Sequence, residues 1–169
     1  NDVNGYASGL LEEILEPSNM NLAYKRVKAN KGSYGVDGMT VNELLQFLKQ
    51  NSKQLRQSLL EGKYNPQPVR RVEIPKADGG TRLLGIPTVV DRVIQQSIAQ
   101  ILSPMYERKF SKTSYGFRPN KSAKEAVLKC KEYIDTGYKW AVDIDLAKYF
   151  DTVNHDKLMR LLSETIKYG

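Results

Sequence analysis

Three carboxylates stand close together in the segment WAVDIDLAKYFDTV, which covers residues 140–153. They are Asp143, Asp145 and Asp151. Apolar residues flank the first two, and a short run of this kind is typical of a buried strand. Side chains alternate between the two faces of a strand. We therefore expect Asp143 and Asp145 to share one face, opposite a core face made by the apolar residues at 142, 144 and 146.

Two carboxylates on one strand face repel each other unless a cation, a basic residue or water lies between them. A magnesium ion suits this arrangement, because Mg²⁺ is held by one or two carboxylates together with phosphate oxygens. The residues leave a plainer alternative open, in which the face meets water and a lysine pairs with Asp143 or Asp145. Asp151 has a separate role available, since with Thr152 or Asn154 it can cap the next helix.

A basic hairpin is the second feature whose residues could take part in binding or chemistry. The segment RRVEIPKADGGTRLLGIP predicts two short strands joined by a turn at Asp78-Gly79-Gly80, where residues that tolerate positive φ are needed. Lys76 and Arg82 flank this turn. Two such cations can clamp a triphosphate, the lysine as a point charge and the arginine as a fork. An ordinary basic hairpin is the alternative, and the chain has neither a G-x-x-x-x-G-K-[ST] nor a G-x-G-x-x-G phosphate motif.

The elements that must position these groups are predicted from apolar periodicity and capping residues. Thr40 and Glu43 have the spacing of a capping box, in which each side chain satisfies an amide at a helix start. A loop with three glycines, KGSYGVDGMT, precedes that helix. Expected helices cover residues 18–30, 40–60, 89–102, 122–134 and 151–166, with a buried strand over 138–146.

Composition favours a polyanionic partner. The chain has 26 Lys and Arg against 19 Asp and Glu, a net charge of +7, which suits nucleic acid or an anionic membrane surface. A basic protein without such a partner is the alternative. No apolar run is long enough to span a bilayer. Cys130 is the single cysteine, which excludes an internal disulfide, and we expect its side chain to fill the core. His155 is the single histidine, so a His/Cys metal site is not expected, and we expect a structural role for His155.

Four blocks of the sequence occur in the order typical of one enzyme family. They are NKGSYGVDGMT, IPKADGGTRLLGIPTVVDRVIQQSI, SYGFRPNKSAKEAV and DIDLAKYFDTVNHDKL. Together they resemble a group II intron reverse transcriptase, also called an intron-encoded maturase. A small departure is Leu83, where the family often has proline after the arginine.

This resemblance implies an α+β fold, the fingers and part of the palm of a right-hand polymerase. Residues 1–61 would form an N-terminal helical extension of the fingers, 62–118 the fingers with their β-hairpin, and 119–169 an incomplete antiparallel-sheet palm. The implied reaction is RNA-directed DNA polymerisation, alongside binding and splicing of the intron RNA. The implied partners are intron RNA, an RNA template, a DNA primer and deoxynucleoside triphosphates, in a bacterial cytoplasm and without a membrane. The sequence does not decide whether the protein forms a homodimer.

The resemblance also assigns roles to individual residues. The family's catalytic aspartate precedes an aromatic residue by five positions and an aspartate by six, which selects Asp145 over Asp143. Asp145 and the backbone carbonyl of Leu146 would hold metal in a site for two Mg²⁺ ions. Phe150 would exclude a ribose 2′-hydroxyl. The remaining roles are triphosphate binding by Lys76 and Arg82, and nucleic-acid contact by Lys31, Arg70, Arg71, Gly79, Gly80 and Arg118.

A complete polymerase site needs a second carboxylate pair, which the family carries in a Y-x-D-D hairpin. These 169 residues contain no such motif. We therefore expect an N-terminal fragment that is catalytically incomplete by itself. Two alternatives stay open: an RNA-binding maturase module without polymerase activity, and a reverse transcriptase of the retron or diversity-generating kind.

Overall fold

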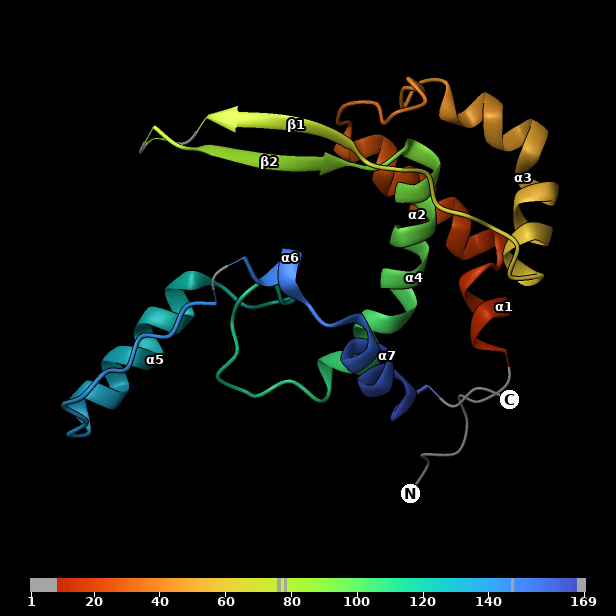
Figure 1. Cartoon of the computed structure of the whole chain (residues 1–169). Helices are drawn as coiled ribbons and strands as arrows, with labels where there is room; N and C mark the ends of the chain where they lie inside the picture. The colour runs from red at the N-terminus through yellow and green to blue at the C-terminus, as the bar shows by residue number, and fades with distance from the viewer. Residues whose placement is uncertain (1–8, 76, 78, 147, 167–169) are drawn as a thin grey trace. The chain divides into compact units, whose positions relative to one another are not determined.

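The computed structural model describes residues 9–75, 77, 79–146 and 148–166 (Figure 1). The chain divides into two compact units, Gly9–Pro104 and a second that contains the described residues from Met105 onward. The fold is α+β, as expected: helices and one two-stranded antiparallel sheet. The elements in chain order are α1 (Leu10–Ile14), α2 (Pro17–Asn30), α3 (Leu44–Leu60), β1 (Arg70–Pro75), β2 (Thr81–Ile86), α4 (Val89–Glu107), α5 (Ala123–Asp135), α6 (Tyr149–Thr152) and α7 (His155–Ser163).

The first unit is built around a core shared by α2, α3 and the first half of α4. Each helix contributes apolar residues at helical spacing, which is why three polar-faced helices can enclose one core. The buried members are Ala23, Val27, Leu44, Leu55, Val89, Val90, Val93 and Ile94. Partly buried residues of the same helices, including Met20, Tyr24, Phe47 and Leu48, pack against this cluster.

Local sequence explains where the helices begin. Pro17 occupies the first turn of α2, one residue before the expected cap at Ser18, because its fixed φ suits that position and its missing amide costs nothing there. Helix α3 begins at Leu44 rather than at residue 40, and only half of the expected capping box forms before it. The Glu43 carboxylate accepts from the Thr40 amide at 2.8 Å and from its hydroxyl at 2.7 Å. These hydrogen bonds lower the pKa of Glu43.

The hairpin forms as expected, although Lys76 and Asp78 of its turn lie outside the described residues. The strands pair from Arg70 opposite Ile86 to Pro75 opposite Thr81. Residues directly opposite each other share a face of the pair. Arg82 therefore lies on the face of Ile74, whereas Arg71 lies on the other face with Gly85.

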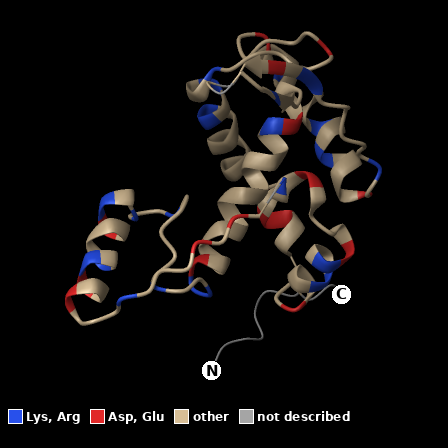
Figure 2. Ribbon diagram, turned by 60° about the vertical axis from the view of Figure 1, so that its left-hand side comes forward, with Lys and Arg blue, Asp and Glu red and all other residues tan. Residues whose placement is uncertain are grey.

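The second unit buries little of its surface. Helix α5 begins at Ser122, whose hydroxyl accepts from the Glu125 amide at 3.2 Å, and α7 begins at Asn154, whose side chain accepts from the Lys157 amide at 2.8 Å. None of the residues of α5 or α7 is buried. Lysines and acidic residues are both distributed along α5, as Figure 2 shows. Its ion pairs, Lys129 with Glu132 and Lys131 with Asp135, are exposed and stabilise it only weakly.

Several expectations for this unit were wrong. The expected buried strand over 138–146 has no regular structure, and Trp140 and Val142 are 94% and 84% exposed. A strand obtains its ladder hydrogen bonds from neighbours, and β1 and β2 pair only with each other in the described part of the chain. Cys130 is exposed rather than in the core, because no residue of α5 is buried by a neighbour in the described part of the chain.

Two further helix boundaries differ from the expectation. Asn154 caps α7 alone, while Asp151 lies inside the separate short helix α6. Helix α4 continues beyond residue 102 and contains Pro104. A proline removes one backbone donor from a helix, and α4 tolerates that loss near its carboxyl end. Among the described residues, no helix has both the length and the apolar character needed to cross a membrane.

Candidate nucleic-acid interface

A buried carboxylate fixes the base of the hairpin. Asp91, in the first turn of α4, is 4% exposed. Its oxygens accept from the Thr88 hydroxyl at 2.7 Å, the Tyr64 hydroxyl at 2.7 Å and the Gln67 amide at 3.2 Å. Tyr64 and Gln67 lie just before β1, and Thr88 lies just after β2. One side chain therefore ties both ends of the hairpin to the start of α4.

Burial and the Asp91 carboxylate act together on Tyr64. Burial is the larger cause, and the hydrogen bond and nearby negative charge of Asp91 add to it, so that the pKa of Tyr64 is raised well above its usual value. Loss of the Tyr64 proton would leave two negative oxygens in contact. The hydroxyl therefore stays protonated and continues to donate over the whole neutral range.

Two arginines fasten the glycine-containing loop before α3 to the same region. Arg92 of α4 donates to the carbonyls of Lys31, at 3.2 Å, and Ser33, at 2.9 Å. Arg70 of β1 donates to the Tyr34 carbonyl at 3.0 Å and to the Ser33 hydroxyl at 2.6 Å. The Arg70 guanidinium also lies over the Tyr34 ring, 4.4 Å from its centroid, where a cation–π attraction operates.

Gly35 brings the backbone of this loop against the start of α4. It is buried, and a Cβ placed on it would lie 2.6 Å from the Thr88 Cα and 2.7 Å from the Thr88 nitrogen. Those atoms are backbone and cannot move aside as a side chain could. The loop, the hairpin base and the start of α4 thus form one locked assembly within the first unit.

Exposed cations whose side chains have no partner among the described residues border this assembly. The side chains of Lys31, Arg71 and Arg82 make no hydrogen bond or ion pair within the described ranges, and all three residues are exposed. Exposed cations carried on a rigid backbone support attract phosphates. The register separates Arg71 from Arg82 onto opposite faces, so a ligand lying flat on one face meets only one of them. Gly79 and Gly80 are exposed near the turn, and Gly79 has a φ of +84°.

Arg118, expected to contact nucleic acid, has a set of protein partners in the second unit. Its guanidinium donates to Oε1 of Glu107 at 2.7 and 3.0 Å and to Oε2 at 3.2 Å. It also donates to the carbonyls of Ser111 and Ser114, at 2.6 and 2.8 Å. Its side chain is only 9% exposed. These hydrogen bonds lower the pKa of Glu107. Arg118 therefore closes the loop that follows α4, and contact with nucleic acid stays a prediction for it.

The carboxylates of the DIDLAKYFD segment are exposed to solvent. Asp143 and Asp145 are exposed in an irregular stretch, and the Leu146 side chain is 63% exposed. No group of three or more potential metal-ligating side chains (His, Cys, Asp or Glu) forms among the described residues. Phe150 is 90% exposed and contacts Tyr149 edge-on, with ring centroids 5.3 Å apart. The donor set present here does not fit a complete metal site.

Sequence reasoning overlooked three of the residues that build the interface. These are Tyr64, Asp91 and Arg92. One signal was available: Thr88 and Asp91 have the T-x-x-D spacing of a helix start, and the Asp91 amide does donate to the Thr88 hydroxyl at 3.1 Å. No local pattern pairs Tyr64 with Asp91 or Arg92 with the loop, because these contacts join segments far apart in the chain.

Comparison with known proteins assigns this arrangement to a family. Residues 74–167, more than half of the chain, match the model of the reverse transcriptase (RNA-dependent DNA polymerase) family. The chain belongs to this family. The matched range includes both the hairpin strand β2 and Asp145.

Curated relatives narrow the class to intron-encoded reverse transcriptases and maturases. The chain is 36% identical over 159 residues to the group II intron-encoded protein LtrA of Lactococcus lactis subsp. cremoris, covering 94% of this chain and 26% of LtrA. It is 36% identical over 149 residues to a putative COX1/OXI3 intron 2 protein of Saccharomyces cerevisiae, covering 86% of this chain and 17% of that protein. It is also 37% identical over 163 residues to Protein YkfC of Escherichia coli, covering 93% of this chain and 43% of YkfC. The chain thus spans less than half the length of these relatives.

Proposed function

We propose that this chain is the N-terminal part of a group II intron-encoded reverse transcriptase and maturase, and that the longer protein copies RNA into DNA and assists splicing of its intron. The observation that carries the proposal is the family match over residues 74–167, which contains Asp145 in the spacing of the family's catalytic aspartate. The RNA template, DNA primer, intron RNA and deoxynucleoside triphosphates are the proposed partners.

Within that protein, the first unit would act mainly as the fingers. Residues 1–61 are proposed as their N-terminal extension, 62–118 as the fingers with the hairpin, and 119–169 as the first part of the palm. Lys31, Arg70, Arg71, Arg118 and the glycines of the hairpin turn would follow the phosphate backbone. Lys76 and Arg82 would meet the triphosphate, and Phe150 would contact the sugar. What supports this is the locked assembly that carries the exposed Lys31, Arg71 and Arg82.

Magnesium is the proposed cofactor, and the donors of this chain supply only part of its site. Asp145 and the Leu146 carbonyl are two oxygen ligands, whereas Mg²⁺ takes an octahedral set of oxygens. Further carboxylates and substrate phosphates would have to provide the others. When bound, the metal ions would stabilise the attacking and leaving oxygens of nucleotide transfer. The role of Asp145 itself is to hold a fixed negative charge beside the primer end.

The test uses the longer protein. Replacement Asp145→Asn should reduce primer extension by at least a hundredfold while leaving RNA binding within twofold, because the amide keeps the shape of the side chain and loses its charge. Asp143→Asn is the matched control, two residues away and also exposed, and should reduce primer extension less than tenfold. Loss of activity in Asp143→Asn with activity kept in Asp145→Asn would show that the catalytic register is shifted by two residues.

A second function is an RNA-binding maturase module without polymerase activity. The observation that favours it is that the exposed cations gather on the hairpin and its loop, whereas the aspartates of residues 143–145 have no described neighbour to complete a metal site. A longer protein that lacks a Y-x-D-D motif beyond residue 169, and that promotes intron splicing without extending primers, would support this function over the first.

A further inference from the structure

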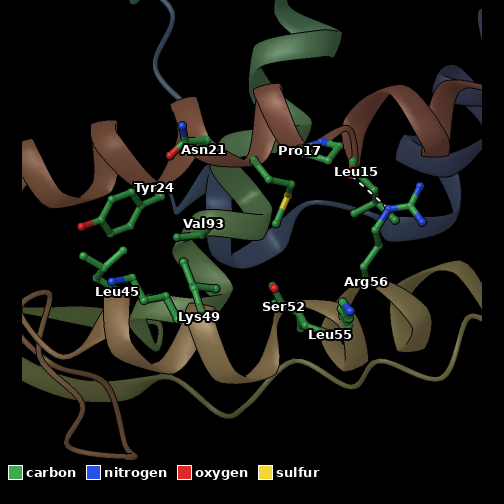
Figure 3. A pocket seen from close by; sticks show the side chains of 13 residues that line it. Leu15, Pro17, Asn21, Tyr24, Leu45, Lys49, Ser52, Leu55, Arg56 and Val93 are labelled. Carbon is green, nitrogen blue, oxygen red and sulfur yellow. Dashed lines mark hydrogen bonds between the residues drawn. The ribbon is translucent and has the colours of Figure 1, made fainter.

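A groove with apolar walls lies between α2 and α3 in the first unit, with Val93 of α4 behind them (Figure 3). Its volume is about 410 Å³, which falls within the range of about 300–1,000 Å³ that is usual for binding sites. Its apolar lining includes the half-buried or exposed Met20, Tyr24, Leu45 and Leu48, with the buried Leu15 and Leu55 behind them. The groove belongs to neither the hairpin nor the aspartate segment.

Three cations line one edge of this groove. They are Lys49, Lys53 and Arg56 of α3, spaced so that they follow each other along one side of the helix. Helix α3 contains no acidic residue, and within the described ranges no carboxylate pairs with any of the three. Arg56 uses its Nε to donate to the Leu15 carbonyl at 3.3 Å, which holds its guanidinium at the end of the groove (Figure 3).

The length of the groove distinguishes between ligands. Its α3 wall extends from Leu45 to Arg56, about 16 Å at the helical rise of about 1.5 Å per residue. A small amphipathic anion has one head group and would leave two cations unpaired. A phosphate backbone would pair with the cations and leave the apolar wall facing water. A helix with one apolar face and a row of carboxylates beside it satisfies both the wall and the edge.

We propose that this groove binds an amphipathic helix of a protein partner, with its apolar side chains against Leu45 and Leu48 and its carboxylates opposite Lys49, Lys53 and Arg56. The proposal does not depend on polymerase activity. Burial of the apolar face would provide most of the affinity, and the row of charges would fix the orientation and select acidic partners.

Two synthetic helical peptides of about 18 residues test this proposal by fluorescence anisotropy with the 169-residue chain. Both carry the same leucines at helical spacing; one has glutamates beside the apolar face and the other has lysines at those positions. We expect the acidic peptide to bind at least tenfold more tightly. The double replacement Lys49→Glu/Lys53→Glu should lower the affinity for the acidic peptide at least tenfold and allow the lysine peptide to bind.

Matched variants separate groove binding from general attraction. Lys25→Glu changes an exposed charge on α2 outside the groove and should alter binding less than twofold. Leu45→Glu places a charge on the apolar wall at a residue that is already 40% exposed. The fold should therefore survive, while binding of the acidic peptide should be lost. Equal binding of the two peptides, or an unchanged affinity in Leu45→Glu, would overturn the proposal.

Competition identifies other occupants. Displacement of the acidic peptide by oligouridylate, with the same dependence on Lys49 and Lys53, would assign the groove to RNA and overturn the proposal. Binding of dodecanoate in the absence of any peptide binding would assign it to a small amphipathic anion, with the same consequence.

Discussion

At the scale of single residues, Gly35 allows two backbone segments to pack closely because it has no Cβ. Its buried backbone lies against the backbone of Thr88, and there is no space for a Cβ. Overpacking at a rigid contact of this kind costs about 1–3 kcal/mol. We predict that Gly35→Ala lowers the free energy of unfolding by that amount, measured by urea denaturation.

Gly116 offers the matched control for this prediction. It is exposed, and a Cβ added there would meet nothing within 4 Å. Gly116→Ala should therefore change the free energy of unfolding by less than about 0.5 kcal/mol. An equal effect of the two substitutions would mean that the close approach at Thr88 contributes nothing to stability.

Tyr64 gives the same region a defined pH dependence. Its pKa is raised in the folded protein, first by burial and then by Asp91. An unfolded tyrosine titrates near pH 10. Above that pH the unfolded chain loses this proton while the folded chain keeps it, so the folded state binds more protons and the stability falls as the pH rises. Below that pH the contribution is complete.

We predict a steeper loss of stability between pH 9 and 11 in the unsubstituted chain than in Tyr64→Phe. At pH 7 the same substitution should cost about 1–2 kcal/mol, since one hydrogen bond to a buried carboxylate is lost while the bonds from Thr88 and Gln67 remain. Urea midpoints across this pH range measure both effects. Tyr138→Phe, at an exposed position, is the control and should retain the steeper slope.

At the scale of elements, the hairpin and the aspartate segment behave in opposite ways. The hairpin has an internal strand partner and an anchor at each end through Asp91. The segment from Lys139 to Leu146 has neither: none of its residues makes a backbone hydrogen bond within the described ranges. Its alternating polar and apolar residues have the pattern of a strand, and a strand cannot form without a neighbour.

We therefore predict that amide hydrogen exchange separates these two elements in the 169-residue chain. Amides of β1 and β2 that face the partner strand should be protected, and those from Lys139 to Leu146 should exchange at nearly unprotected rates. In a longer protein with further strands, the same segment should gain at least a hundredfold protection. Equal protection in the shorter chain would mean that the segment forms a strand without partners.

At the scale of the whole molecule, charge is the dominant property. The net charge of +7 and the exposed Lys31, Arg71 and Arg82 suggest contacts with phosphates rather than with base edges. If about three to six phosphates are contacted, RNA affinity should fall by about ten- to a thousandfold between 50 and 200 mM salt. Fluorescence anisotropy with a labelled RNA across that range provides the measurement. A flat salt response would contradict the proposed phosphate contacts.

Local sequence determined much of the first unit. Periodic apolar residues, the expected caps Ser18 and Thr40 and the turn glycines were enough to predict α2, α3, the beginning of α4 and the hairpin, although α2 and α3 begin at Pro17 and Leu44. These elements form as predicted because their signals are local and because α2, α3 and α4 bury their apolar faces against one another. The order of four motifs likewise indicated the reverse transcriptase family, which the match over residues 74–167 confirms.

Only the tertiary structure decided how the candidate site is held. Asp91 binds Tyr64 and Gln67, which precede it by 27 and 24 positions in the chain. Arg92 donates to a loop about 60 residues away, so no local pattern contains these contacts. The same reason explains the failures. The strand expected over 138–146 and the buried Cys130 both depend on neighbouring elements, and a sequence pattern that favours burial produces none when the described chain provides nothing to pack against.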